Sequence, residues 1–213
     1  MTRLFLTRHG ETEWNEKGMM QGWGNSPLTE LGIKQGEWLR DRIKVLPIDI
    51  IYSSPIGRAY ETAKIVRGNR DINIILDDGL KEINMGKLEG LNQEEIEKID
   101  KENYFNFWNV PSKYIPTKGG ESFYEVMERS YNAISAIVEK EKGRNILVVT
   151  HTITLKAYLC KLENRDIDTL WDPPFIKQTS LTEINFTEEG YTIPLMACMK
   201  HHKYSRKEFN EFK

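Results

Sequence analysis

The chain alternates between short apolar runs and longer segments in which apolar residues recur every three or four positions. The short runs predict buried strands at residues 4–7, 48–52, 72–76 and 145–150. The longer segments predict helices at residues 30–44, 55–66, 93–101, 123–138 and 153–162. Two further β-type runs, at residues 181–186 and 191–196, are separated by Glu-Glu-Gly and predict an antiparallel hairpin.

Three of the predicted helices carry start signals. Thr29 stands as an N-cap before the first, and Ser54-Pro55 is typical of an N-cap followed by a first-turn proline. Ser122 and Glu125 have the spacing of a capping box. Strands that alternate with helices predict an α/β fold, a three-layer α/β/α sandwich with a mostly parallel sheet and an antiparallel edge hairpin. No repeat or linker divides the chain, so residues 1–213 are predicted to form one domain.

The segment 102–120 fits neither the helical nor the strand pattern. It is aromatic, contains proline and has few helix signals, and it lies between the irregular stretch at residues 79–90 and a capped helix. Such a segment is either a lid over a ligand pocket or a packed connection. As a lid, its aromatic character favours a substrate with an apolar or ring-bearing portion.

Polar side chains follow the predicted strands at the edge where ligands bind in sheets of this kind. Arg8 and His9 come directly after the first strand, and His151 comes directly after the strongest one. Arg58 lies in the first turn of the helix after the second strand, and Glu82 lies in the irregular stretch after the third. Ligands in open α/β sheets bind beyond the carboxyl ends of the strands. Two histidines, two arginines and a carboxylate at that edge indicate a phosphoryl site, because guanidinium groups pair with phosphate oxygens.

Composition narrows the classes of function. The 30 Lys and Arg residues against 32 Asp and Glu give a formal net charge of −2, which does not favour a nucleic-acid partner. No apolar run approaches the roughly 20 residues of a membrane-spanning helix, so no membrane partner is expected. Only Cys160 and Cys198 are present, which favours a cytoplasmic location. His201-His202 has no other ligand at metal-binding spacing, so no metal is expected there. An oligomer is possible, but nothing in the sequence supports one.

The chain resembles the histidine phosphatase superfamily, the phosphoglycerate-mutase-like proteins, over most of its length. Six motifs carry the resemblance, and they occur in the following order. The first three are Arg8-His9-Gly10-Glu11-Thr12 with Trp14-Asn15, Ser26-Pro27-Leu28-Thr29 with Gly32 and Gln35, and Tyr52-Ser53-Ser54-Pro55 with Arg58, Ala59, Thr62 and Ala63. The last three are Leu80-x-Glu82 with Gly86, Glu89 and Gly90, then Gly120-Glu121-Ser122, and finally Val149-Thr150-His151. The resemblance implies phosphoryl transfer through a phosphohistidine, with no metal and no cofactor.

The resemblance also implies roles for individual residues. His9 would be the nucleophile, and Glu82 would protonate the leaving oxygen and then activate water. Arg8, Arg58 and His151 would hold the phosphoryl oxygens. The expected substrate-binding residues are Gly10, Glu11, Asn15, Gln21, Gly22 and Thr152.

Three functions compete. Mutases of the family follow the catalytic Glu with Arg-His-Tyr, whereas Glu82 is followed here by Ile83-Asn84-Met85, and the 102–120 segment offers only Lys113 and Lys118 for a second anionic group. The sequence therefore favours a phosphatase acting on a small-molecule phosphomonoester, similar to the α-ribazole phosphatase and broad-specificity groups. A phosphoglycerate mutase is the alternative, and a non-catalytic phosphate-binding or scaffold module is the alternative of another class.

Overall fold

A computed structural model describes residues 1–203 of the chain. Its centre is a six-stranded sheet with the strand order β3-β2-β4-β1-β5-β6. The strands are β1 (Thr2–Arg8), β2 (Ile50–Ser53), β3 (Ile74–Leu76), β4 (Asn145–Thr150), β5 (Leu181–Thr187) and β6 (Gly190–Cys198). The first four in sequence are parallel to one another, and β5 and β6 are antiparallel additions at one edge. The predicted mostly parallel sheet with an edge hairpin is therefore confirmed.

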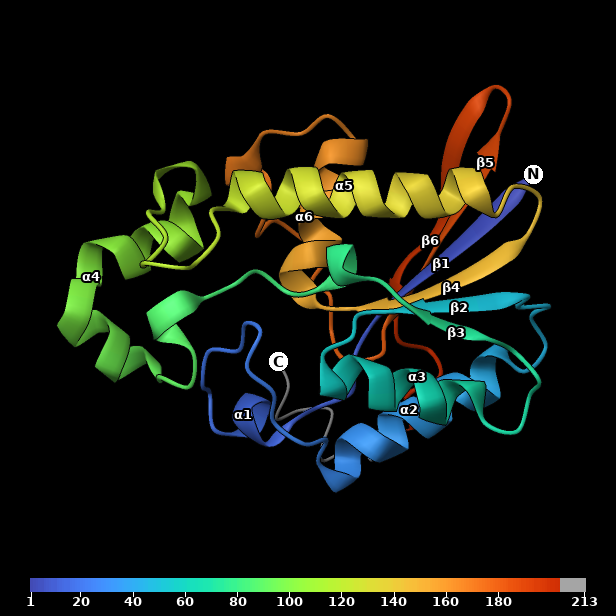
Figure 1. The fold of residues 1–213 in the computed structure, drawn as a ribbon, viewed down its shortest axis with the longest axis horizontal. Coiled ribbons are helices and arrows are strands. Elements are labelled where there is room, and N and C mark those ends of the chain that lie inside the picture. The colour runs from blue at the N-terminus through green and yellow to red at the C-terminus, as the bar shows by residue number, and fades with distance from the viewer. Residues whose placement is uncertain (204–213) are drawn as a thin grey trace.

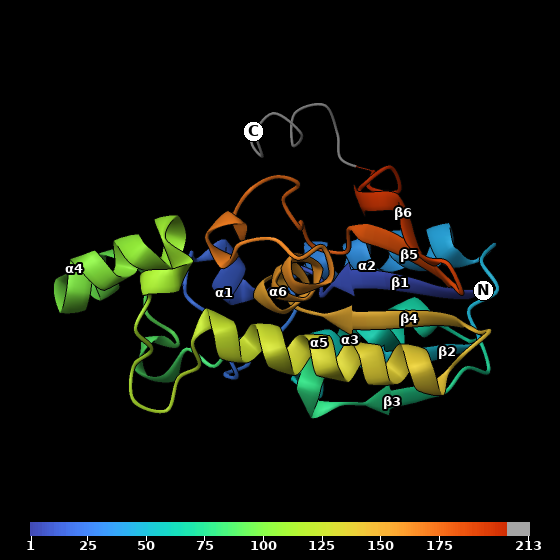
Figure 2. The ribbon, with the colours of Figure 1, turned by 90° about the horizontal axis from the view of Figure 1, so that it is seen from above.

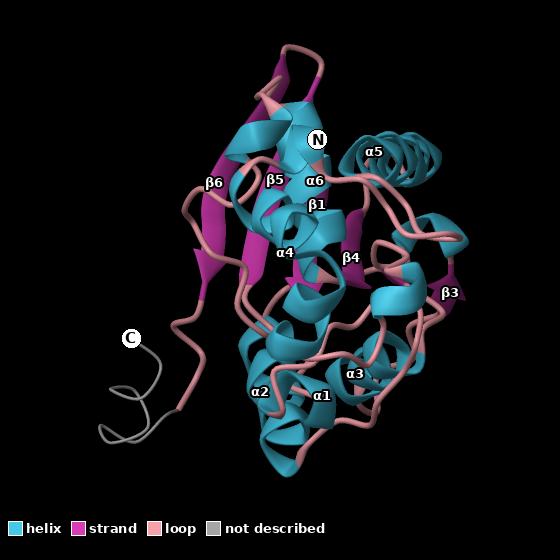
Figure 3. Cartoon of the chain, turned by 90° about the vertical axis from the view of Figure 1, so that its left-hand side faces the viewer, coloured by secondary structure: helices cyan, strands magenta, loops and turns pink. Residues whose placement is uncertain are grey.

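Helices cover both faces of this sheet (Figure 1). Helices α2 (Glu30–Ile43) and α3 (Gly57–Arg67) lie on one face, and α5 (Phe123–Lys140) and α6 (Thr152–Leu162) lie on the other, as the view along the strands in Figure 3 also shows. Within β4, Ile146 and Val148 pack towards α5 and α6, while Leu147 and Val149 pack towards α2 and α3. A strand buried on both faces needs no polar alternation, which explains the continuous apolar run.

The parallel pairing of β1 with β4 brings two distant segments together. Arg8 is in register with Thr150, and the amide of His9 donates to the carbonyl oxygen of Thr150 at 3.0 Å. His9 and His151 each follow the last residue of their strand, so adjacent parallel strands deliver both rings to one sheet edge. The two histidine rings are therefore neighbours because β1 and β4 pair in this register.

The helix after β2 begins later than the sequence signal indicates. Ser54 is not its N-cap: α3 begins at Gly57 with Ile56 in extended conformation before it. The first-turn amide of Arg58 is satisfied by the side chain of Asn25, whose Oδ1 accepts from it at 2.8 Å. A residue from another loop therefore caps α3, and this leaves the Ser54 hydroxyl for other contacts.

The 102–120 segment is more helical than its sequence indicates. Helix α4 (Gln93–Asn109) continues beyond the predicted end, through a break at Asp100 where the backbone leaves the helical region (φ −158°, ψ 92°). The Asp100 carboxylate accepts from the amide of Asn103 at 2.9 Å and so caps the second half of the helix. That Asp-x-x-Asn spacing is a local start signal within a run that otherwise lacks apolar periodicity.

The remaining short elements connect this framework. They are α1 (Glu13–Glu16) and the 3₁₀ turns Asp78–Leu80, Gly86–Leu88, Pro111–Lys113 and Ile167–Thr169. Helix α4 projects beyond the end of the sheet (Figure 2). Residues 204–213 of the single predicted domain lie outside the described residues.

An aromatic cluster joins α4 to the body of the protein. Phe107 is 1% exposed, and its ring lies 4.9 Å from Phe123 and 5.1 Å from Tyr114, with Trp171 at 5.8 Å, measured between ring centroids. Such ring pairs stabilise beyond the area they bury. Phe107 is thus the anchor of the α4 extension.

Phe107→Ala is expected to lower the free energy of unfolding by about 3–5 kcal/mol, because it opens a cavity between α4, α5 and the loops that carry Tyr114 and Trp171. Phe105, two residues earlier in α4 and 56% exposed, is the matched control, and Phe105→Ala should change stability by less than about 0.5 kcal/mol. Urea denaturation of the three proteins measures both values. Equal losses for the two variants would contradict the anchoring role.

Candidate active site

A cavity of about 520 Å³ lies at the carboxyl edge of the parallel strands. Residues from β1, α1, α3, α4, α6 and the connecting loops line it. Seven of the residues expected from the sequence are among them: Arg8, His9, Asn15, Gln21, Arg58, Glu82 and Thr152. The structure therefore brings together side chains that are up to 144 positions apart in the chain (8 to 152).

His9 is held in one tautomer. Its ring is 3% exposed, and Nδ1 lies 2.7 Å from the carbonyl oxygen of Gly10, which can only accept a hydrogen bond. Nδ1 therefore carries the proton, and Nε2 keeps its lone pair. The Nε–H of Arg58 donates to this Nε2 at 3.2 Å, consistent with an unprotonated nitrogen there. A neutral imidazole with an unprotonated ring nitrogen is the form that acts as a nucleophile.

The surroundings also hold His9 neutral. Burial lowers the pKa of His9 well below its ordinary value of 6.5, and the positive charges of Arg58 and Arg8 lower it further. The hydrogen bond to the Gly10 carbonyl acts in the opposite direction but is the smallest of the four effects. His9 is therefore uncharged throughout the physiological pH range.

Arg58 is fixed by backbone carbonyls instead of a carboxylate. Its guanidinium is 1% exposed and donates to the carbonyl oxygens of Gly22 at 2.8 Å and Gly24 at 2.6 Å. Glu89 supports this loop, because its carboxylate accepts from the amides of Trp23 and Gly24 at 2.7 and 2.6 Å. Gly22 thus acts through Arg58, and a Cβ at Gly22 would meet the Glu89 carboxylate at 2.3 Å.

Arg8 is the second cation of the site, and it is partly buried. It donates to the carbonyl oxygen of Ile176 at 3.3 Å, and its Nε has no hydrogen-bond partner within residues 1–203. Burial lowers the pKa of Arg8 to about 10, and burial likewise lowers the pKa of Arg58 to about 10. Both guanidiniums remain charged at neutral pH. Two desolvated cations, one with an unsatisfied donor, favour an anion in the cavity.

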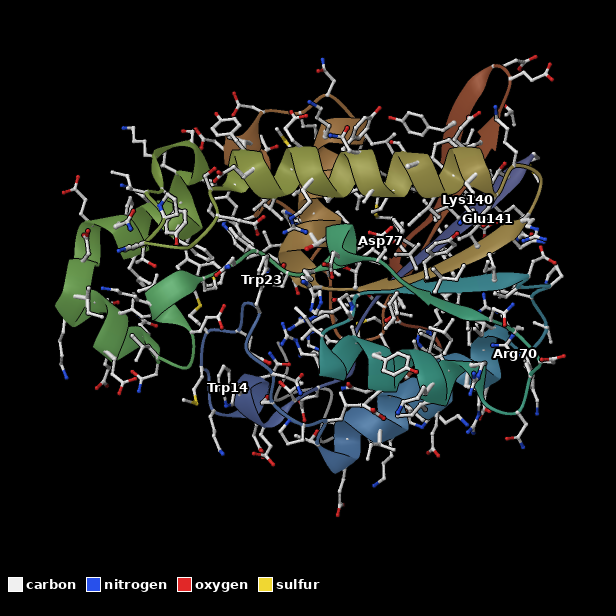
Figure 4. The ribbon with its side chains drawn as sticks, in the orientation of Figure 1. Trp14, Trp23, Arg70, Asp77, Lys140 and Glu141 are labelled. Carbon is white, nitrogen blue, oxygen red and sulfur yellow. The ribbon has the colours of Figure 1, made fainter. Side chains whose placement is uncertain are left out.

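Glu82 sits at the N-terminus of α6. Its carboxyl oxygens accept from the amides of Ile153 and Thr154, at 3.2 and 3.1 Å. Its carbonyl oxygen accepts from Trp23 Nε1 at 2.9 Å and from Arg129 at 3.2 Å. Figure 4 shows Trp23 reaching towards the chain that follows β3. Both the backbone and the side chain of Glu82 are therefore held in place.

His151 lies beside His9 and is fully buried. The two ring centroids are 5.2 Å apart in an edge-to-face arrangement. His151 Nε2 lies 2.8 Å from the hydroxyl oxygen of Ser54, whereas Nδ1 has no hydrogen-bond partner within the described part of the chain. Burial lowers the pKa of His151 well below 6.5, with Arg58 as the next cause.

Gly10 and Glu11 shape the loop after β1 and do not line the cavity. The amide of Gly10 donates to Thr62, and a Cβ at Gly10 would lie 2.4 Å from the carbonyl oxygen of Gly32, so only glycine fits. Glu11 accepts through its carboxylate from the Thr29 hydroxyl at 2.8 Å. These two residues hold the loop between β1 and α1 against α2 and α3.

Asn15 and Gln21 do line the cavity, and each contacts Thr12. Asn15 Oδ1 accepts from the Thr12 amide at 3.2 Å, and Gln21 Nε2 donates to the Thr12 hydroxyl at 2.8 Å. Thr152 lines the cavity as the first residue of α6. Asn15 and Gln21 therefore present one polar edge of the site from the loops around α1.

The sequence indicated only part of the far wall of the cavity, since Phe107 and Trp108 come from the 102–120 segment that was considered as a lid. It is largely apolar and consists of Met19, Met20, Met85, Phe107, Trp108, Ile153, Trp171, Phe175 and Ile176. Lys156 and Lys177 also line it, and the buried ammonium of Lys156 donates to the carbonyl oxygens of Asp172 at 2.6 Å and Pro174 at 3.2 Å. Lys156 lies one helical turn after Thr152, so its place was readable from helix spacing, whereas the 171–177 loop has no periodic signal.

Metal and membrane features are not found in the part of the chain that is described. Within residues 1–203, no group of three or more His, Cys, Asp or Glu side chains is arranged to hold a metal ion. Nor does any helix of these residues have the length and apolar character needed to cross a bilayer.

The fold and this cavity define an α/β protein with a cationic, histidine-containing pocket at the carboxyl edge of its sheet. The chain belongs to the histidine phosphatase superfamily (branch 1), whose family model matches residues 4–198. The family expected from the sequence and its phosphatase class of enzyme are thereby confirmed.

Individual relatives span nearly the whole fold. The structure of YhfR from Bacillus stearothermophilus shares 39% identity, with a TM-score of 0.92 over 94% of this chain and 99% of that one. The α-ribazole phosphatase of Shigella flexneri shares 28% identity, with a TM-score of 0.83 over 92% of this chain and 96% of its own. Phosphoserine phosphatase 1 of Hydrogenobacter thermophilus shares 32% identity over 80% of this chain and 81% of its own length. Other relatives are named phosphoglycerate mutase, so names alone do not separate hydrolysis from mutase chemistry.

In an NMR titration, the His9 ring is expected to stay neutral as the pH falls through 6.5. Arg8→Met removes one neighbouring positive charge and should raise the pKa of His9 towards 6.5, because a like charge no longer opposes protonation. His202, whose pKa burial lowers to about 4, serves as an internal control and should not move, since Arg8 is not among the causes of its shift. Protonation of wild-type His9 near pH 6.5 would contradict the electrostatic account.

Proposed function

We propose that this protein is a metal-independent phosphatase that hydrolyses a small-molecule phosphomonoester through a phosphohistidine on His9. The observation that carries the proposal is the fixed tautomer of His9, with Nδ1–H on the Gly10 carbonyl and the Nε2 lone pair next to the buried Arg58 guanidinium. Phosphoryl transfer needs positioning and charge stabilisation more than covalent chemistry, and this cavity supplies both.

In the first step, Nε2 of His9 attacks phosphorus and the bond between phosphorus and the ester oxygen breaks. Arg8, Arg58 and His151 hold the phosphoryl oxygens, and each close cation stabilises them by about 4 kcal/mol at an effective dielectric of 20, before desolvation is subtracted. Glu82 gives its proton to the leaving oxygen, and the alcohol departs. The charge that develops on phosphoryl oxygens thus meets donors that are already in place.

In the second step, water attacks the phosphohistidine. Glu82 takes a proton from the water, the P–N bond breaks, and Nε2 recovers its lone pair as inorganic phosphate forms. Asn15, Gln21 and Thr152 line the cavity and are proposed to contact the substrate. No step requires a metal ion or a cofactor.

The far wall favours a hydrolase over a mutase. A mutase must grip a second anionic group while the phosphoryl group is returned, but most side chains at that end of the cavity are apolar. Of the two lysines that line the cavity, Lys156 already donates to two backbone carbonyls, which leaves Lys177 for a second anionic group. Lys113 and Lys118 are not among the lining residues. The proposed substrate is therefore a phosphomonoester with an apolar or ring-bearing alcohol portion, such as α-ribazole phosphate, or a range of such esters. The two free cysteines are in keeping with a cytoplasmic setting.

Chelator-treated protein is expected to release phosphate from an aryl phosphate, and His9→Ala should lower kcat by at least about 10⁴-fold, as loss of a covalent nucleophile does in other enzymes. Rapid quenching with a labelled ester should trap an acid-labile adduct on His9 in the wild type. His202→Ala is the matched control, because His202 contacts Thr179 and lies outside the cavity, and it should retain activity.

The alternatives give different results in the same assays. A label trapped on another side chain, or no turnover with O-phosphoserine, α-ribazole phosphate, 3-phosphoglycerate or an aryl phosphate, would overturn the phosphatase proposal and favour a binding module. Isomerisation of 3-phosphoglycerate in the presence of 2,3-bisphosphoglycerate, without release of phosphate, would identify a mutase.

Trp108→Ala is expected to raise KM for an aryl phosphate by about three- to tenfold with little change in kcat, since an aromatic contact contributes roughly 0.5–1.5 kcal/mol. The same change should leave KM for O-phosphoserine within about twofold, because its alcohol portion has no ring to stack. Initial rates with both esters measure the split. An equal loss for both esters would mean that Trp108 does not contact the alcohol portion.

A further inference from the structure

We propose that Ser54 is a positioning residue that fixes the tautomer of His151, so that Nδ1 of His151 carries the proton donated to a phosphoryl oxygen. This inference rests on the proposed function for the identity of the ligand, but the tautomer itself is a property of the resting protein. Ser54 is fully buried at the end of β2, and its hydroxyl oxygen lies 2.8 Å from His151 Nε2.

The hydrogen bonds around Ser54 give its hydroxyl proton one destination. Its oxygen already accepts from the amide of Ile56 at 3.3 Å. Within residues 1–203, the other group bonded to this hydroxyl is Nε2 of His151. A buried hydroxyl that donated to no acceptor would lose the free energy of a hydrogen bond. The Ser54 hydroxyl therefore donates its proton to Nε2 of His151. Nε2 is then the acceptor.

A neutral imidazole has one ring proton, so an accepting Nε2 leaves that proton on Nδ1. Burial and the nearby positive charges keep His151 neutral, because both lower its pKa well below 6.5. Doubly protonated imidazolium is therefore not the resting form. The pair Ser54–His151 thus repeats the logic of Gly10–His9, in which a fixed partner on one ring nitrogen determines the state of the other.

The proton on Nδ1 lacks an acceptor in the resting protein. Nδ1 is buried with no hydrogen-bond partner within the described residues, and the His151 ring centroid is 5.2 Å from that of His9. Arg8 Nε in the same site is also unsatisfied. Two orphaned donors around one nucleophile are explained together by an oxyanion that binds between them. The opposite tautomer would point a lone pair at that anion and repel it.

The local fold supports this role for Ser54. A serine before a proline at the start of a helix would ordinarily cap that helix. Here Asn25 satisfies the first-turn amide of Arg58, so the Ser54 hydroxyl is free to reach His151. The motif that the sequence presents as a helix start therefore contributes to the site.

The test combines a structural and a functional measurement on the full chain. In ¹⁵N-labelled wild-type protein, long-range ¹H–¹⁵N correlation should show His151 with Nδ1 protonated and Nε2 unprotonated. Ser54→Ala should yield a mixture of tautomers and raise the Ki of inorganic phosphate as a competitive inhibitor by about tenfold, the size of one hydrogen bond to a charged group. Ser54→Thr keeps a hydroxyl and should restore the wild-type tautomer and Ki.

Ser130→Ala is the matched control, since Ser130 is equally buried but donates to the Met127 carbonyl within α5. It should change stability without changing the His151 tautomer or the Ki. Protonated Nε2 in the wild type, or unchanged tautomer and Ki in Ser54→Ala, would overturn the proposal. The wild-type spectrum decides the question even if the Ser54 variants do not fold. Failure of the phosphatase proposal would appear separately, as full turnover in His9→Ala.

Discussion

The constraint around which this structure is organised is the placement of two guanidinium groups, Arg58 buried and Arg8 partly buried, without a carboxylate partner. Arg58 bonds to two carbonyl oxygens and to His9, and Arg8 bonds to one carbonyl oxygen. Neutral acceptors compensate a buried charge only in part, so a net positive potential remains in the cavity. Burial is the main reason that both histidines are neutral, and that potential lowers their pKa further. The same potential attracts an anion. Pairing either arginine with a carboxylate would stabilise the resting protein but weaken both effects of the potential.

Several segments of the chain hold the guanidinium groups and the surrounding backbone in place. The loop 22–24 accepts from Arg58 on its carbonyl side and donates to Glu89 on its amide side, so one carboxylate orients the acceptors without neutralising the guanidinium directly. On the opposite side, Glu121 pairs with Arg129, which donates to the carbonyls of Gly79, Lys81 and Glu82. Acidic residues thus stabilise the backbone around the site and do not pair with the guanidinium groups that would hold the phosphoryl group.

Sequence patterns predicted a mostly parallel sheet with an edge hairpin, because buried strands and hairpins have local signals. They also placed His9 and His151 at one edge of the sheet, because each directly follows a buried strand. The two rings are neighbours because β1 pairs with β4, and no strand order was predicted from the sequence. The patterns gave a wrong start for α3 because its cap, Asn25, comes from a distant loop, which no local window contains. They missed the second half of α4 because Asp100 interrupts the apolar period. The roles of Ser54 and Glu89 depend on hydrogen bonds between loops, and no spacing rule encodes these contacts.

The two ends of the cavity are held by different kinds of contact. As a result, the residues that act on the phosphoryl group are separate from those that select the alcohol portion of the substrate. The cationic end is set by strand termini and close backbone contacts, such as Gly10 against Gly32, where one added carbon would clash. The apolar end is set by side-chain packing among Phe107, Trp108 and Trp171, which tolerates changes of shape better than a backbone contact does. Substitutions in α4 and the 171–177 loop can therefore alter which alcohol portion fits while the groups that act on phosphorus keep their geometry. A single fold can accommodate different esters in this way, since the residues that select the alcohol are not those that hold the phosphoryl group.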